Sequence, residues 1–193
     1  MMIYTGVGSR KAPPDILRLM QELGRIFGQA GWTLRSGGAG GADEAFEEGA
    51  DDVGGLKEIY EPWPGFSTRT GAMSTRVNKE ALSMAATVHP AWAMLSQAAQ
   101  KLHARNCFQL LGASLTVPSN IAVCWTPDGI EMASQRTRSS GGTATAVVLA
   151  ERAKVPVYNL KNQSSCNKLA VFLQSKGLPV PEQLTALLQG SLF

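Results

Sequence analysis

The chain has little charge and no long apolar run, and each absence excludes a class of protein. Charged residues make up 17% of its 193 residues and hydrophobic residues 44%, whereas ordinary globular proteins carry about 25% charge. This composition excludes a disordered chain. No stretch of about 18 apolar residues occurs, and the first residues lack the pattern of a signal peptide. We therefore expect one compact domain, residues 1–193, in the cytoplasm and without a membrane partner.

Cysteine and histidine are also scarce. The three cysteines, Cys107, Cys124 and Cys166, form no C-x-x-C pair, and only His89 and His103 could assist them. A structural zinc site or a disulfide framework is therefore not expected, and we expect no metal and no other cofactor. The net charge of +3 is too small for a dedicated duplex-binding domain, so nucleic acid is a possible partner but not the favoured one.

Glycine, in contrast, is concentrated near the beginning of the chain. Twelve of the 20 glycines lie at or before Gly55. A local excess of glycine indicates backbone conformations or close approaches that a Cβ atom would block. Several of these glycines directly follow predicted strands, where ligand-binding turns occur.

Short apolar strands alternate with helical patterns along the sequence. Strands are predicted at residues 2–7, 32–35, 56–60, 121–125 and 157–160. Helices are predicted at residues 14–30, 42–50, 76–86, 91–111, 143–154, 165–176 and 181–188. This alternation predicts an α/β fold, a Rossmann-like, doubly wound and mostly parallel sheet with helices on both faces. The C-terminal helices, about residues 164–190, should pack on it, and residues 62–75, with Trp63 and Phe66, should form a loop or lid over a ligand.

Three loops have the composition of phosphate-binding turns. Residues 6–10, G-V-G-S-R, contain two glycines of a G-x-G-x-x-G pattern, with Lys11 at the position of the third. Residues 36–43, S-G-G-A-G-G-A-D, place four glycines before a helix, where backbone N–H groups can converge on an anion. Residues 139–146, S-S-G-G-T-A-T-A, repeat this arrangement and add hydroxyl groups. The alternative for each loop is a tight turn that uses glycine only for its backbone freedom.

These loops supply the candidate ligand-binding residues. The first two loops contribute Gly8, Ser9, Arg10, Ser36, Gly37, Gly38, Gly40, Gly41 and Asp43. The third contributes Gly141, Gly142, Thr143 and Thr145. Trp125 and Thr126 follow the apolar strand 121–125, where the indole could stack on a base. The alternative for Trp125 is a core position at the end of the strand.

The order of several motifs resembles that of the SMF/DprA–LOG (SLOG) superfamily, in particular its stand-alone, phage-type DprA-like and LOG-like members. The motifs are G-V-G-S-R, R-S-G-G-A-G-G-A-D-E-A-F, H-A-R-N, A-V-C-W-T-P-D-G, S-G-G-T-A-T-A and V-P-V-Y-N-L, between Ile3 and Leu160. The resemblance implies a Rossmann-like fold whose members bind nucleotides or nucleotide-derived signals, hydrolyse nucleoside monophosphates, or load single-stranded DNA. It also implies a homo-oligomer and, for a phage protein, a location in the host cytoplasm.

The resemblance also indicates which residues act. LOG-type phosphoribohydrolases use an arginine of an H-x-R-K-like segment, which Arg105 matches, with Asn106 in place of the lysine. They also use a glutamate of P-G-G-x-G-T-x-x-E, and here Val148 occupies that position. A valine cannot act as a general acid or base. If the protein is an enzyme, Asp43 or Glu44 must supply the carboxylate, although both could instead complement the dipole of their own helix.

Three functions follow as hypotheses. The first is binding of a nucleotide or nucleotide-derived messenger through phosphate, with Arg105 and Asn106 contributing, which in a phage protein could sequester a host defence signal. The second is an N-glycosidic hydrolase acting on nucleoside 5′-monophosphates, with Arg105 positioning the phosphate. The third is a DprA-like mediator that binds single-stranded DNA. The missing glutamate favours binding over hydrolysis.

Overall fold

A computed structural model describes residues 1–67 and 77–184. Its strands are β1 (Ile3–Gly8), β2 (Thr33–Ser36), β3 (Lys57–Ile59), β4 (Ile121–Trp125) and β5 (Val157–Asn159). Its α-helices are α1 (Pro14–Gln29), α2 (Ala42–Asp51), α3 (Lys79–Val88), α4 (Gln97–Leu111), α5 (Thr143–Arg152) and α6 (Gln163–Ser175). Single 3-10 turns lie at Trp92–Met94, Ala133–Gln135 and Arg138–Ser140. Within the described ranges, no helix combines the length and apolar character needed to cross a bilayer.

The five strands form one sheet in the order β3-β2-β1-β4-β5, and every neighbouring pair is parallel. The predicted Rossmann-like, doubly wound sheet is therefore confirmed. The strand order reverses at β1, which pairs with β2 on one side and with β4 on the other. Gly8 is the register partner of Trp125, so the loops that leave β1 and β4 begin side by side.

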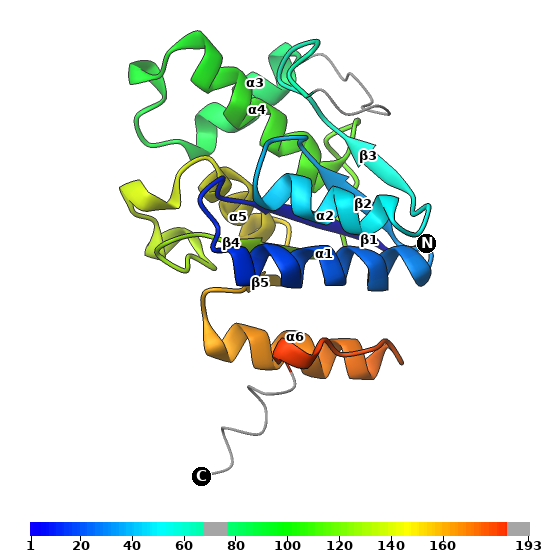
Figure 1. Ribbon diagram of the computed structural model, residues 1–193. Helices are drawn as coiled ribbons and strands as arrows, with labels where there is room; N and C mark the ends of the chain where they lie inside the picture. The colour runs from blue at the N-terminus through cyan, green and yellow to red at the C-terminus, as the bar shows by residue number, and fades with distance from the viewer. Residues whose placement is uncertain (68–76, 185–193) are drawn as a thin grey trace.

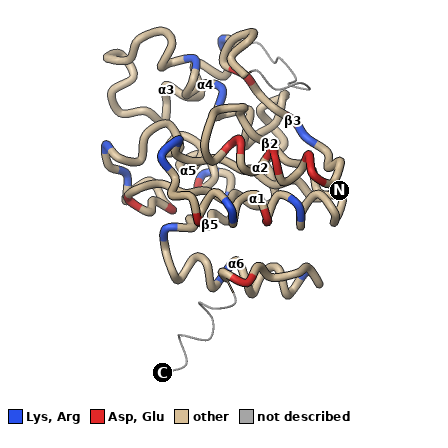
Figure 2. Tube along the Cα trace, in the orientation of Figure 1, with Lys and Arg blue, Asp and Glu red and all other residues tan. Residues whose placement is uncertain are grey.

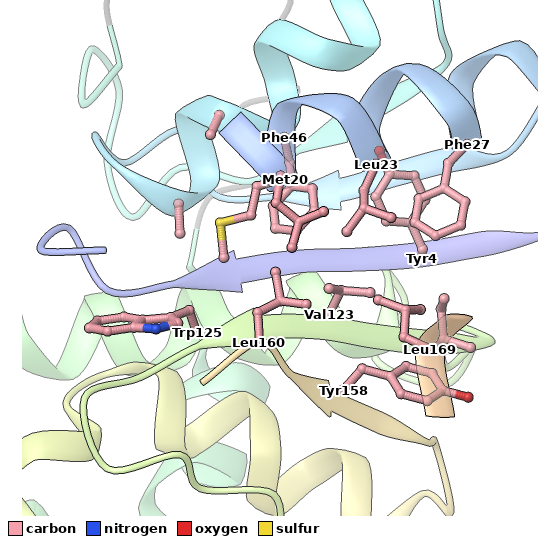
Figure 3. Packing of buried hydrophobic residues seen from close by; sticks show 14 of the residues in the cluster. Tyr4, Met20, Leu23, Phe27, Phe46, Val123, Trp125, Tyr158, Leu160 and Leu169 are labelled. Atoms are coloured by element: carbon pink, nitrogen blue, oxygen red, sulfur yellow. The ribbon is translucent and has the colours of Figure 1, made fainter. Parts of the chain in front are cut away.

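Helices cover both faces of the sheet. One apolar cluster joins α1, α2 and α6 to the sheet, and a second joins α3, α4 and α5 to it. Figure 1 shows α3 and α4 together at the end of the molecule that lies away from α6. Figure 3 shows the first cluster, in which Met20, Leu23 and Phe27 of α1 face Val123 and Tyr4 of the sheet. Because helices cover both faces of the sheet, a ligand-binding site is expected at the ends of the strands.

Part of the glycine excess serves the packing of α1 on α2. A Cβ atom built at Gly24 would lie 2.6 Å from the carbonyl oxygen of Phe46, and one at Gly49 would lie 1.9 Å from that of Gln21. Both glycines therefore allow the two helix backbones to approach closely. This role differs from phosphate binding, so the glycine bias has more than one cause.

Capping side chains move two helix starts away from their predicted positions. The helix predicted from residue 91 begins at Gln97, because the Ser96 side chain accepts a hydrogen bond from the Ala99 amide. Asn78 caps α3 in the same way, accepting from Ala81. The predicted lid, residues 62–75, and the predicted helix 181–188 lie partly outside the described residues.

Candidate functional site

A cleft of about 340 Å³ lies at the carboxyl ends of β1 and β4. Its walls come from residues 7–11 after β1, residues 39 and 43 around the start of α2, residues 102, 105 and 106 of α4, and residues 139–143 before α5. Ligands of open α/β sheets bind where the strand order reverses, and this cleft lies at that point. Segments far apart in the sequence thus meet at the place that the fold predicts.

A buried ion pair forms the inner wall of the cleft. Nη1 of Arg105 lies 3.1 Å from Oδ2 of Asp43, and the side chains are only 6% and 2% exposed. Burial raises the pKa of Asp43, and the Arg105 guanidinium opposes this rise. Burial likewise lowers the pKa of Arg105, and Asp43 opposes it. Each charge is therefore stabilised mainly by the other, which fixes the position of the guanidinium.

Gly37 leaves the space that the Arg105 side chain occupies. A Cβ atom built at Gly37 would lie 1.0 Å from Nη1 of Arg105, a distance that only glycine avoids. Gly41, with φ +85°, lies against the backbone of Arg10, 2.7 Å from its Cα by the same measure. The second glycine loop therefore packs against both arginines, and of residues 36–41 only Ala39 lines the cleft.

The third loop presents its backbone and the start of α5 to the cleft. Residues 139–143 all line the cleft, and Thr143 is the first residue of α5. The loop is held from both sides. Asp128 accepts hydrogen bonds from Ser140 and Thr137, and the Asn106 Nδ2 atom donates to the Gly142 carbonyl at 2.6 Å. A helix N-terminus that faces a cleft favours an anion.

The predicted site residues divide into two groups. Those that line the cleft are Gly8, Ser9, Arg10, Asp43, Arg105, Asn106, Gly141, Gly142 and Thr143. Those that the structure places elsewhere are Ser36, Gly37, Gly38, Gly40, Gly41, Glu44, Trp125, Thr126 and Thr145. Of the two carboxylates proposed for catalysis, only Asp43 lies in the cleft wall.

Three side chains of the second group have their polar or aromatic groups engaged elsewhere. Trp125 is 7% exposed and belongs to the core cluster of the sheet, as Figure 3 shows. Thr126 accepts hydrogen bonds from Asn159 and from the amide of Ile130. The Thr145 hydroxyl lies 2.7 Å from Nδ1 of His103. Trp125 thus takes the alternative core position at the end of its strand, and the hydroxyls of Thr126 and Thr145 contact protein groups.

Sequence reasoning missed Lys11 and Leu102 in the cleft wall. In the sequence, Lys11 stands at the third glycine position of the G-x-G-x-x-G pattern. Leu102, Arg105, Asn106 and Gln109 have the spacing i, i+3, i+4 and i+7 of one helix face. Arg105, Asn106 and Gln109 are all buried, and three polar residues on the inward face of a helix are a signal that could have located the site.

Several buried polar atoms of this wall have no hydrogen-bond partner. Within residues 1–67 and 77–184 these atoms include Asp43 Oδ1, Arg105 Nε and Asn106 Oδ1. Buried polar groups are nearly always paired, and leaving one unpaired costs about 1–3 kcal/mol.

The rim of the cleft is positively charged. Arg10 and Lys11 are exposed and line the cleft. The guanidinium carbons of Arg10 and Arg105 each lie 5.8 Å from the centroid of the Phe66 ring, a cation–π distance. Figure 2 shows acidic and basic residues interspersed over the described part of the chain.

The position of the LOG-type glutamate is apolar in the structure. Val148 is buried in the cluster formed by α3, α4 and α5. Glu151, one turn later, accepts a hydrogen bond from the Ala133 amide and does not line the cleft. Within the described ranges, no group of three or more His, Cys, Asp or Glu side chains could hold a metal ion.

A doubly wound parallel sheet with a polar cleft at its strand-order reversal defines a Rossmann-like protein. No protein-family model and no curated protein matches the sequence. The chain is similar in structure to the single-stranded-DNA-binding DNA processing protein A of Helicobacter pylori, with a TM-score of 0.52, 14% identity, and coverage of 98% of this chain and 81% of that one. It also matches the Moco carrier protein of Chlamydomonas rheinhardtii, with a TM-score of 0.49, 20% identity, and coverage of 91% and 85%. The similarity to DNA processing protein A shows a shared fold.

Proposed function

We propose that the cleft binds a nucleotide or a nucleotide-derived molecule through its phosphate. The observation that carries this proposal is the meeting of Arg10 and Lys11 with the N-terminus of α5 across one cleft at the strand-order reversal. Exposed cations and helix N–H groups both attract phosphate. The guanidinium of Arg105 lies at the inner wall, where the Asp43 carboxylate balances its charge.

The size and chemistry of the cleft fit this class of ligand. A volume of about 340 Å³ lies at the lower end of the range for small-molecule pockets, about 300–1,000 Å³. Phe66, next to two guanidinium groups, offers an aromatic face near the rim.

Isothermal titration with ribonucleoside mono-, di- and triphosphates, dinucleotides and cyclic dinucleotides tests the proposal. Binding of at least one class should weaken about tenfold or more in the double variant R10Q/K11Q, because two charge-assisted contacts are lost. The matched control is R18Q, an exposed arginine of α1 that does not line the cleft. Equal affinity of R10Q/K11Q and the wild type would overturn the assignment of phosphate to this rim.

N-glycosidic hydrolysis is a second candidate, favoured by the carboxylate of Asp43 in the cleft wall. In this reaction water adds its oxygen to the anomeric carbon of the ribose, the C–N bond breaks, and the base leaves with a proton. The pairing of Asp43 with Arg105 and the valine at position 148 favour binding without turnover. Mass spectrometry of the titrated mixtures decides, since free base and ribose 5-phosphate form only if the enzyme hypothesis is right.

Binding of single-stranded DNA is tested by the same titration with an oligonucleotide. DNA processing protein A binds single-stranded DNA, but the present chain has a net charge of only +3 with its charges interspersed. A dedicated backbone-binding surface is more strongly basic. We therefore expect oligonucleotide binding weaker than nucleotide binding, with the reverse order supporting the DNA hypothesis.

A further inference from the structure

A second cavity lies between the end of α3 and α5, outside the cleft. Its volume is about 490 Å³, and it is lined by residues 87–90 at the end of α3, residues 133 and 136, and residues 148 and 152 of α5. None of these residues lines the cleft at the strand-order reversal. The cavity is therefore a separate candidate site, which the proposed function does not use.

Two arginines of this cavity are held at the end of α3. Nη1 of Arg136 donates to the carbonyl oxygen of Val88 at 2.6 Å. Arg152 donates from Nη1 to the Thr87 hydroxyl at 2.9 Å and from Nη2 to the Thr87 carbonyl at 3.1 Å. Because Thr87 and Val88 are consecutive, these contacts bring both guanidinium groups to the same wall of the cavity.

Neither arginine forms an ion pair with a carboxylate in the part of the chain that the structure describes. Glu151, which precedes Arg152 in the sequence, accepts a hydrogen bond from the Ala133 amide instead. A guanidinium has several N–H donors, and the bonds to α3 use only some of them. Carbonyl groups at a helix end attract a cation, but they do not neutralise two. The remaining positive charge and the free N–H groups favour an anion.

His89 adds a further donor to the same lining. Its Nδ1 atom accepts a hydrogen bond from the Ala91 amide at 3.2 Å, so the proton of the neutral ring is on Nε2. Burial and the charge of Arg136 lower the pKa of His89, which keeps the ring neutral near pH 7. The carbonyl of Val88 and the hydroxyl of Thr87 already accept from the arginines. The side chains of this lining therefore offer mainly donors to a ligand.

We propose that this cavity is a second anion site, which binds a phosphate group or a similar oxyanion through Arg136 and Arg152. The planar guanidinium group matches the oxygen atoms of such an anion, and the scarcity of free acceptors selects against a cation. A volume of about 490 Å³ is more space than one phosphate fills, so the oxyanion belongs to a larger molecule. The site goes beyond the nucleotide cleft, and each can exist without the other.

NMR titration of the wild-type protein with inorganic phosphate tests the inference, with the side-chain Nε–H signals of its arginines as probes. We expect the signals of Arg136 and Arg152 to shift together along one saturable curve. Sodium chloride at the same ionic strength should not reproduce these shifts. Shifts that do not saturate, or that chloride reproduces, would show only charge screening and would overturn the inference.

Two double variants separate this site from the cleft. R136Q/R152Q should weaken the phosphate response of the backbone amides that follow α3 about tenfold or more, because two charge-assisted contacts are lost. R10Q/K11Q should retain the wild-type response there, as should the control R138Q, an exposed arginine that lines neither site. Loss of this response in R10Q/K11Q would assign it to the cleft and contradict the proposal. The wild-type titration decides even if R136Q/R152Q does not fold.

Discussion

At the scale of single residues, the position of Arg105 explains most of the site. Its guanidinium is held by Asp43, lies over Gly37 and approaches the ring of Phe66. None of these neighbours is close to Arg105 in the sequence. A buried charge is stable only when its partners are fixed, so Arg105 acts as a rigid group rather than a flexible surface cation.

Removal of Arg105 should leave the Asp43 carboxylate buried without its main partner. The variant R105M should therefore lose about 3–5 kcal/mol of unfolding free energy, measured by urea denaturation. The double variant D43N/R105M should be more stable than R105M, because the uncompensated charge is gone. If the loss in D43N/R105M equals the sum of the losses in the single variants D43N and R105M, the pair contributes no coupling energy.

Two alanine substitutions in residues 36–41 test whether this loop makes room for Arg105 or binds an anion. G37A should collide with the guanidinium and cost about 1–3 kcal/mol or more. G40A is the matched control, because its nearest neighbour would be Oε2 of Glu44 at 3.9 Å and its φ is not left-handed. G40A should therefore change stability by less than about 0.5 kcal/mol and leave nucleotide affinity unchanged. A comparable loss of nucleotide affinity in G37A and G40A would instead support anion binding by this loop.

The residues of the site were only partly predictable. The H-A-R-N segment and the acid after the glycine loop predicted Arg105 and Asp43 as site residues, and both line the cleft. The engagement of Trp125 in the core and of Thr145 with His103 depends on which face each element buries. Contacts between segments far apart in the sequence decide which face of each element is buried, and a single sequence does not show these contacts.

At the scale of elements, α4 connects the cleft to α5. Arg105 and Asn106 face the cleft, whereas His103 on the same helix contacts Thr145 of α5. The start of α4 was predicted six residues too early, because an apolar pattern does not show where Ser96 ends the preceding turn. The strand 121–125 was predicted with its observed bounds, since a fully buried strand is a continuous apolar run.

The contact of His103 predicts a pH dependence of stability. Burial, together with the positive charges of His89 and Arg136, lowers the pKa of His103 to about 4 from an ordinary value of 6.5. Between these values the unfolded chain binds a proton that the native state excludes, so stability is lost as the pH falls. The loss should reach about 1.4 kcal/mol per pH unit.

Urea denaturation of the wild type and of H103Q between pH 7 and pH 4.5 measures this contribution. The difference in unfolding free energy between the two proteins should shift in favour of H103Q as the pH falls, because glutamine does not titrate. A difference that is independent of pH would show that His103 has the same pKa in both states.

At the scale of the whole molecule, the sheet order creates the site. Strands β1 and β4 are adjacent, although more than a hundred residues separate them in the sequence, so the loops that follow them form opposite walls of one cleft. The alternation of strands and helices predicted the doubly wound parallel sheet, but not the strand order that places these two loops opposite each other. The small net charge is consistent with a local anion site, whose affinity should fall less with salt than that of an extended nucleic-acid surface.

The central claim is that a nucleotide phosphate binds between the loop after β1 and the start of α5. Its most direct test is a backbone-amide NMR titration of the isotope-labelled protein with a ribonucleoside 5′-monophosphate. The account predicts that the largest shift changes occur in residues 8–11 and 139–143, with smaller changes in residues 37–41. Changes centred on the surface of α1 and α6, or no changes at saturating nucleotide, would contradict it.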